Sequence, residues 1–189
     1  MPNFSGEQDE QIAKAVQAGE LEKFGELVTR YEDRLKRYGR RFLGSPAEIE
    51  DIVQEVFLKA YKNFNSYDPG QKFSPWVYRI AHNEFVNTLR RNGHYPLSYF
   101  DPDLIFPVPQ EPRRPERLYA SEESKKFVEA ALEKLAPKYK EPLVLFYFED
   151  QEYKDIAEIL HLPISTVGVR IKRGREALKK LIEQAGYSL

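Results

Sequence analysis

The sequence predicts an all-α protein, in which two small helical domains are joined by an extended proline-rich linker and the second domain contains a helix-turn-helix. No stretch alternates convincingly between apolar and polar residues, which is the pattern typical of β-strands. Apolar residues recur instead at helical spacing on both sides of residues 93–120. That segment holds six of the 13 prolines and has no sustained helical period, so it is the expected linker.

Composition limits the classes of protein to which the chain can belong. Its 189 residues, 41% of them hydrophobic, are enough to build real cores. It has no cysteine, which excludes a disulfide framework or a thiolate metal site and favours a reducing compartment, the cytoplasm. No apolar run reaches the roughly 18 residues of a membrane span, and the first residues, MPNFSGEQDEQ, are polar and acidic. We therefore expect a cytoplasmic protein without membrane insertion.

The first domain, residues 1–92, is expected to be a set of helices broken at residues 18–20, 44–46 and 65–75. Its last helix, FSPWVYRIAHNEFVNTLRRN, is amphipathic. The apolar side consists of Val77, Ile80, Ala81, Phe85 and Leu89, and the polar side of Arg79, Asn83, Asn87 and Arg90. We expect the apolar side to pack in the core and the polar side to contact a ligand.

Aromatic residues surround the polar side of this helix. Trp76 projects near it, and the preceding loop adds Phe64, Tyr67 and Phe73. Aromatic rings interleaved with Arg and Asn are what unpaired nucleic-acid bases require, because rings stack on bases and amides bond to base edges. The alternative is that these aromatic residues belong to the core. We favour the core for Phe64 and Phe73 and leave both interpretations open for Trp76.

Charge is segregated along the chain, although the net charge is only −1. Residues 170–180 carry six cations and one acid, whereas EIEDIVQE, residues 48–55, has four acids and no cation. Two surfaces of opposite charge indicate two different partners. Asp51 and Glu55, one helical turn apart, could instead form a metal or acid/base site. No histidine neighbours them in sequence, however, and an exposed protein-docking face is the simpler interpretation.

The second domain, residues 121–189, is expected to begin with Ser121 as a helix cap and to be all-helical. Breaks between its helices are expected at residues 136–137, 149–152 and 161–164, where proline or turn-forming residues interrupt the helical period.

A helix-turn-helix is predicted by DIAEILHLPISTVGVRIKRGREAL, residues 155–178, in which a short helix and a sharp break precede a longer cationic helix. Ser165, after Pro163, is the expected N-cap of the longer helix. Its inward side consists of Val167, Ile171, Gly174 and Leu178, and its outward side of Ser165, Val169, Lys172, Arg173 and Glu176. Long cations and short polar groups suit a DNA major groove. A solvated cationic face on an ordinary helical hairpin is the alternative.

Three segments, in this order, resemble a known protein family. They are DIVQEVFLKAY (51–61), YDPGQKFSPWVYRIAHN (67–83) and, beyond the proline-rich segment, residues 131–181. Together they are similar to bacterial RNA polymerase sigma factors of the extracytoplasmic-function (ECF) group, within the sigma-70 family, over nearly the whole chain. The resemblance implies a sigma factor that binds core RNA polymerase and directs it to promoters. The first domain would read the non-template strand of the −10 element, and the second the duplex −35 element.

The resemblance also implies roles for individual residues. Asp51, Gln54 and Glu55 match the family's surface for the β′ clamp helices of core polymerase. Arg79 and Asn83 match the −10-reading helix, and the loop 65–74 resembles one that captures a flipped base. With their neighbours, the expected −10 contacts are Tyr67, Trp76, Arg79, Asn83, Asn87 and Arg90. The expected −35 contacts are Ser165, Thr166, Gly168, Val169, Arg170, Lys172 and Arg173.

Two positions depart from the family pattern. Gly168 and Val169 stand where many relatives have a cation and a serine, which weakens hydrogen-bond readout at the −35 element. His161 stands in the turn where glycine is usual, so it is expected near the left-handed helical conformation.

The expected partners are core RNA polymerase, through its β′ clamp helices and β flap, promoter DNA, and an anti-sigma factor. Asp101 and Asp103 in the linker are expected to thread toward the RNA path of the polymerase, as the family's linkers do. No enzymatic activity, cofactor, catalytic residue or metal ligand is expected, because the chain lacks phosphate-loop and nucleophile motifs and His82, His94 and His161 lack ligand spacing. The alternatives are an autonomous dimeric helix-turn-helix regulator and a mimic that sequesters a partner.

Overall fold

The computed structural model describes residues 8–93 and 122–185, with side chains for 8–93 and 128–185. Every regular element within these residues is an α-helix or a 3₁₀-helix, which confirms the prediction of an all-α fold with two helical regions. The chain divides into two compact units, residues 1–95 and residues 96–189. The expected linker with Asp101 and Asp103, the histidine at 94 and the cap at 121 lie outside the described residues.

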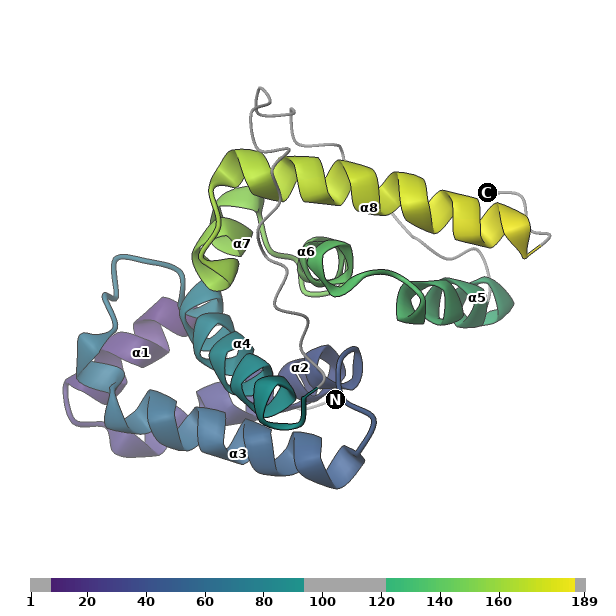
Figure 1. Cartoon of the computed structure of the whole chain (residues 1–189). Helices are drawn as coiled ribbons and strands as arrows, with labels where there is room; N and C mark the ends of the chain where they lie inside the picture. Colours follow the sequence, from purple (N-terminus) through teal and green to yellow (C-terminus); the bar gives the residue numbers. More distant parts are fainter. Residues whose placement is uncertain (1–7, 94–121, 186–189) are drawn as a thin grey trace. The chain divides into compact units, whose positions relative to one another are not determined.

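The first unit is a bundle of four α-helices with two short 3₁₀ turns (Figure 1). Its elements are α1 (Asp9–Gln17), η1 (Leu21–Lys23), α2 (Phe24–Arg40), α3 (Pro46–Lys62), η2 (Phe64–Ser66) and α4 (Phe73–Arg91). The breaks follow the turn residues of the sequence: Ser45 caps α3 by accepting a hydrogen bond from the Glu48 amide at 3.3 Å, with Pro46 at the first helical position. The core is formed by side chains such as Leu27, Tyr31, Leu35, Val53, Val56, Val77, Ala81 and Phe85.

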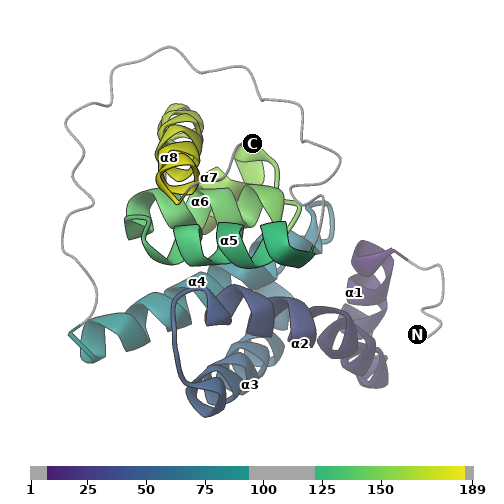
Figure 2. The ribbon, with the colours of Figure 1, turned by 90° about the vertical axis from the view of Figure 1, so that its right-hand side faces the viewer.

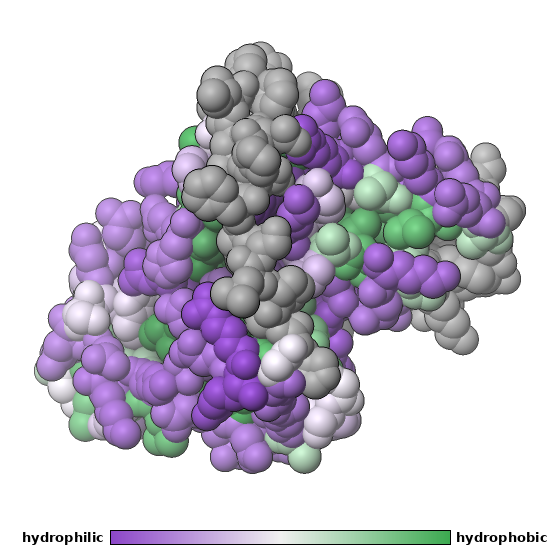
Figure 3. Space-filling view, in the orientation of Figure 1, coloured by the Kyte–Doolittle hydropathy of each residue, from purple (hydrophilic) through white to green (hydrophobic). Residues whose placement is uncertain are grey.

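The second unit consists of α5 (Glu122–Glu133), α6 (Pro137–Tyr147), α7 (Tyr153–Leu160) and α8 (Ile164–Gln184) (Figure 2). Its main core contains Leu143, Val144, Ile156, Ile159, Val167 and Ile171. A smaller cluster of Val128, Ala131, Leu132 and Ile182 joins α5 to the end of α8, and Figure 3 shows apolar side chains between these two helices. The long helix α8 is therefore held at both ends, which fixes the face that it presents to solvent.

The turn between α7 and α8 has the backbone expected for a helix-turn-helix. His161, the C-cap of α7, has φ 53° and ψ 46°, which confirms the expected left-handed conformation. The amide of Leu162 closes the turn by donating to the carbonyl of Ala157 at 3.0 Å. The expected N-cap of α8 is wrong: the helix begins at Ile164, and Pro163, with φ −59° and ψ 142°, is the capping residue. Pro163 is the last extended residue before α8, and its ring fixes φ at a value that the following helix can continue. Ser165 therefore lies inside the first turn of α8.

Candidate functional site

The middle of α3 carries an exposed acidic face. Asp51, Gln54 and Glu55 are all exposed there, while the opposite side of the helix is buried. Glu55 lies 3.7 Å from the Lys59 amine, which lies 2.7 Å from a carboxylate oxygen of Glu84 on α4. The hydrogen bond with Glu84 raises the pKa of Lys59, so this amine stays charged. Among the described residues no group of three His, Cys, Asp or Glu side chains could hold a metal ion.

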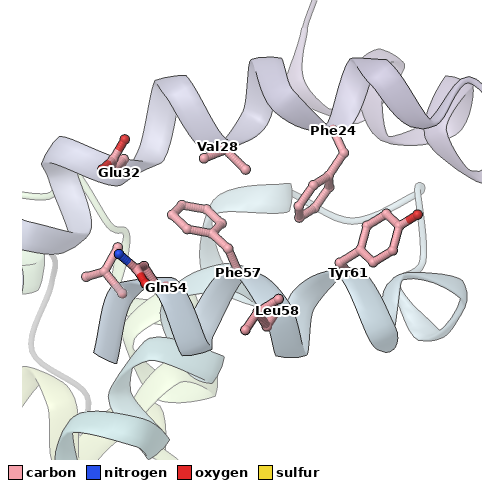
Figure 4. Close-up of a pocket in the computed structure, with 8 residues that line it drawn as sticks. Phe24, Val28, Glu32, Gln54, Phe57, Leu58 and Tyr61 are labelled. Atoms are coloured by element: carbon pink, nitrogen blue, oxygen red, sulfur yellow. The ribbon is translucent and has the colours of Figure 1, made fainter. Parts of the chain in front are cut away.

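An apolar groove of about 400 Å³ lies beside this acidic face, between α2 and α3 (Figure 4). Leu58 and Tyr61 are exposed at its edge, 53% and 45% of their surface respectively, which is unusual for side chains of this size on a helical bundle. Gln54 lines the groove and also belongs to the acidic face. The groove is lined by Phe24, Val28, Glu32, Val53, Gln54, Phe57, Leu58 and Tyr61. Sequence reasoning missed it, although two apolar residues one turn apart on the solvent side of α3 could have indicated it.

The polar side of α4 faces solvent as predicted. Asn83, Asn87 and Arg90 are exposed and Arg79 is half-buried, in a row along one side of the helix. Val77, Ala81 and Phe85 on the other side are buried in the core. These four residues follow one another at spacings of three or four positions, so the two amides and the two guanidinium groups form a polar stripe along α4.

Trp76 lies at the start of this stripe, on the outer side of an aromatic cluster. Its ring centroid is 5.8 Å from that of Phe64, 5.3 Å from that of Tyr67 and 5.6 Å from that of Phe73. Phe64 and Phe73 are buried, which confirms the interpretation that we favoured for them. Trp76 itself is half-buried, so part of the indole ring is accessible to a ligand. The cluster is therefore a supported platform with one partly open ring.

Tyr67 does not lie where the sequence led us to expect a DNA contact. It is only 3% exposed, and its hydroxyl donates a hydrogen bond to the carbonyl of Gln71, across the loop before α4. Burial, followed by the nearby carboxylates of Glu10, Asp68 and Asp9, raises the pKa of Tyr67, so the hydroxyl remains a donor at neutral pH. Tyr67 therefore supports the loop from within.

The cationic helix α8 divides its polar residues between two sides. Lys172 is exposed, and Ser165, Val169 and Arg173 are half-buried on the outward side, whereas Val167, Ile171 and Gly174 are buried as predicted. Thr166, Gly168 and Arg170 are buried too, so the expectation that they contact DNA is not supported. The physical reason is the helical period, which places Arg170 within a small angle of Val167 and Gly174.

Arg170 is a buried charge rather than a surface cation. It is 2% exposed, and the same unit also buries the carboxylates of Glu141, Glu149 and Asp155. A guanidinium group is too costly to bury without counter-charges, and these three carboxylates are the buried acids of the described part of the unit. We therefore regard Arg170 as part of the interior that holds α8 in place.

Comparison with known proteins identifies the family. Residues 27–95 match the family Sigma-70 region 2, and residues 128–178 match Sigma-70, region 4. The ECF RNA polymerase sigma factor SigW of Bacillus subtilis is 35% identical to the chain over 175 residues, which are 88% of the chain and 92% of SigW. The chain belongs to the ECF sigma factors of the sigma-70 family. This ECF sigma factor is also 32% identical to the ECF RNA polymerase sigma-E factor of Escherichia coli K12, over 93% of the chain and 94% of the relative.

Solved structures agree with this assignment. CnrH, in a complex with the cytosolic domain of CnrY, is 27% identical to this ECF sigma factor and matches it with a TM-score of 0.69, over 93% of the chain and 97% of CnrH. The sigma factor RpoE of Bartonella quintana, solved with the anti-sigma factor NepR, has the same fold, with a TM-score of 0.63 at 21% identity over 85% of the chain and 96% of RpoE.

Family membership confirms the resemblance seen in the sequence. Sigma factors are transcription initiation factors and not catalytic enzymes, and the family assignment favours this function over an autonomous helix-turn-helix regulator. None of the helices in the described ranges is long and apolar enough to cross a membrane.

Proposed function

We propose that this ECF sigma factor acts in the cytoplasm, binds core RNA polymerase through the acidic face of α3, and reads promoters with two separate surfaces. The β′ clamp helices are the partner of Asp51, Gln54 and Glu55, and the β flap is a further polymerase contact. The single observation that supports the proposal is the arrangement of three chemically distinct exposed surfaces on a sigma-70 fold: an acidic face, an amide and aromatic stripe, and a cationic recognition helix.

The stripe on α4 suits the unpaired non-template strand of the −10 element. Trp76 offers a partly open ring on which a base can stack, and Asn83 and Asn87 offer amides that can donate to and accept from base edges. Arg79 and Arg90 add positive charge for the backbone. A base held in this way cannot return to the duplex, so strand opening is driven by capture of bases and needs no nucleotide hydrolysis by this chain.

The outward side of α8 suits the duplex −35 element. Lys172 and Arg173 reach phosphates or guanine edges from a helix placed in the major groove, while Ser165 and Val169 are short enough to let the helix approach closely. Val169 makes an apolar contact and offers no hydrogen bond. Readout at this element therefore depends on few side chains, which predicts a permissive −35 preference.

An anti-sigma factor is the second protein partner that we propose. CnrH, the 27% identical neighbour, was solved with the cytosolic domain of another protein, CnrY. The groove between α2 and α3 is apolar and shares Gln54 with the acidic face. A segment with apolar side chains on one side and cations on the other would match both surfaces at once. Because the two surfaces are continuous, such a partner would exclude the polymerase from α3.

The polymerase contact is tested by reversing charge on α3. Asp51→Lys combined with Glu55→Lys should abolish co-elution with core polymerase, because cations replace the acids of the docking face, while circular dichroism shows an intact fold. Asp51→Lys alone should weaken co-elution. Asp33→Lys, the same change at an exposed position on α2, is the matched control and should bind normally. Unchanged binding by the double variant would remove the clamp assignment.

A further inference from the structure

The short helix α1 lies before the segment that matches the sigma-70 region 2 family, which begins at residue 27. Its last residue, Gln17, nevertheless reaches across the first unit to the segment between α3 and α4. The side-chain amide of Gln17 donates two hydrogen bonds, to the carbonyl of Phe64 at 3.0 Å and to that of Tyr67 at 2.8 Å. Figure 1 shows α1 beside this segment. One amide therefore fixes two backbone positions whose side chains belong to the aromatic cluster.

A second side chain of α1 fixes the start of α4. The carboxylate of Glu10 accepts a hydrogen bond from the amide of Phe73, the first residue of α4, at 3.0 Å. Lys72, which precedes it as the N-cap, makes no capping hydrogen bond of its own. Glu10 thus replaces the missing local cap, and its negative charge is favourable beside the N-terminus of a helix.

A third side chain attaches α1 to the body of the unit. The carboxylate of Asp9 lies 2.6 Å from the guanidinium group of Arg30, and it accepts a hydrogen bond from the hydroxyl of Tyr31 at 2.5 Å. Both partners belong to α2, whose Tyr31 is buried in the core. Consecutive residues Asp9 and Glu10 therefore join α2 to the start of α4, and α1 acts as a rigid brace between them.

We propose that α1 positions residues 64–73 and the aromatic platform around Trp76 for capture of an unpaired promoter base, with Gln17 and Glu10 as the positioning residues. This inference rests on the −10 role proposed for α4. Among the described residues three rings contact Trp76, and two of them are Phe64 and Tyr67, whose carbonyls accept hydrogen bonds from Gln17. The third, Phe73, is held by Glu10. Each of these three rings is therefore held through its backbone by a side chain of α1.

The test compares substitutions of α1 side chains that bond to other elements with a substitution of one that bonds only to the N-cap of α1. Gln17→Leu keeps the size of the side chain but removes both donated hydrogen bonds. Gln11→Leu is the matched control, because within the described residues the Gln11 side chain accepts from the amide of Gln8, the N-cap of α1, and bonds to no other element. Glu10→Ala removes the acceptor for the start of α4, whereas Glu10→Gln retains an oxygen in the same place and loses only the negative charge, so it should lie closer to wild type than Glu10→Ala.

Two readouts follow from the position of Trp76. It is the only tryptophan in the chain, so its emission and its quenching by acrylamide report on the platform in the free protein. Gln17→Leu and Glu10→Ala should increase quenching, and the holoenzymes that they form should give about tenfold fewer permanganate-reactive open complexes. Co-elution with core polymerase and binding to a −35 duplex should not change. Gln11→Leu should match wild type in every assay, and Glu10→Gln should lie closer to wild type than Glu10→Ala does.

Wild-type quenching and wild-type promoter opening in Gln17→Leu and Glu10→Ala would overturn the inference. If Gln17→Leu loses helix content, the pair Glu10→Ala and Glu10→Gln decides, since only the first removes an acceptor. A different outcome is that quenching changes in the variants as expected but the wild-type holoenzyme opens no promoter. That outcome would overturn the −10 assignment and with it the role of α1 in strand opening.

Discussion

Gly39 of α2 lies against the ring of Phe85 on α4, so closely that a Cβ at position 39 would come within 2.8 Å of two ring carbons. Such a Cβ would also lie 3.0 Å from a methyl carbon of Ile49 on α3. Three helices therefore meet at this glycine, and its lack of a side chain sets how closely they pack.

Alanine at position 39 should destabilise the first unit. Overpacking a core costs about 1–3 kcal/mol, which exceeds the gain of up to about 1 kcal/mol from replacing glycine within a helix. Gly25 on the same helix is the matched control, because a Cβ there would meet nothing within 4 Å. Urea unfolding should show a lower free energy of unfolding for Gly39→Ala and an equal or higher one for Gly25→Ala. Equal effects of the two substitutions would contradict the close packing.

The two promoter-reading surfaces should act separately. Arg173→Ala should relax sequence preference at the −35 element, because a good contact between Arg and a guanine edge contributes about 1–3 kcal/mol of discrimination. Asn83→Ala should impair strand opening and −10 choice without changing the −35 profile. Promoter selection and permanganate footprinting on both variants provide the measurement. A changed −10 profile in Arg173→Ala, or unchanged profiles in both Arg173→Ala and Asn83→Ala, would contradict the assignment of separate −10 and −35 surfaces.

Arg170 and Lys172 should differ in what their loss does, although both are cations of α8. Arg170→Met should lower the free energy of unfolding of the second unit by about 3–5 kcal/mol, because it removes a buried cation from an interior that also buries three acidic side chains. Lys172→Met, at an exposed position, should leave stability unchanged and weaken binding to any DNA duplex, with a smaller dependence on salt. Thermal unfolding and duplex titrations separate the two effects. A stable Arg170→Met variant with impaired DNA binding would restore Arg170 to the DNA surface.

Tyr31 should make the first unit sensitive to alkaline pH. Burial, followed by the Asp9 carboxylate, raises the pKa of Tyr31 above its ordinary value of 10.0. The folded chain then holds this proton more tightly than the unfolded chain does. The resulting stabilisation is complete below pH 10.0 and is lost as the pH rises above that value toward the folded pKa. Urea midpoints measured across this range should fall more steeply in wild type than in Tyr31→Phe, and parallel slopes would refute the effect.

Periodicity and turn residues predicted the helices and the turn of the second unit, apart from the residue at which α8 begins. His161 was expected in the left-handed conformation because it stands in the turn where the family usually has glycine, and the backbone confirms this. Arg170 was misplaced because its charge was taken as a sign of exposure, whereas the angle around the helix places it inward. Charge type is a weaker guide than angular position when buried acids are available in the same unit.

The brace formed by α1 and the groove beside α3 could not be predicted in the same way. Gln17 and Tyr67 are 50 residues apart, and a glutamine at the end of an amphipathic helix carries no signal of a distant acceptor. The groove likewise requires Phe24 and Tyr61 to approach from two helices, where their ring centroids lie 5.3 Å apart. Both features depend on how helices pack, and single-helix patterns do not contain that information.

The recognition helix keeps its supporting residues apart from its outward ones. Val167, Arg170 and Ile171 hold α8 in the unit, and none of them is among the residues that face outward. Substitutions that change promoter preference therefore need not destabilise the second unit. Under the proposed −35 role, a duplicated copy of this gene could acquire a new regulon through substitutions at Ser165, Val169 and Lys172 alone, while the fold stays unchanged. A laboratory library randomised at the same three positions would yield variants with new −35 preferences on the same fold.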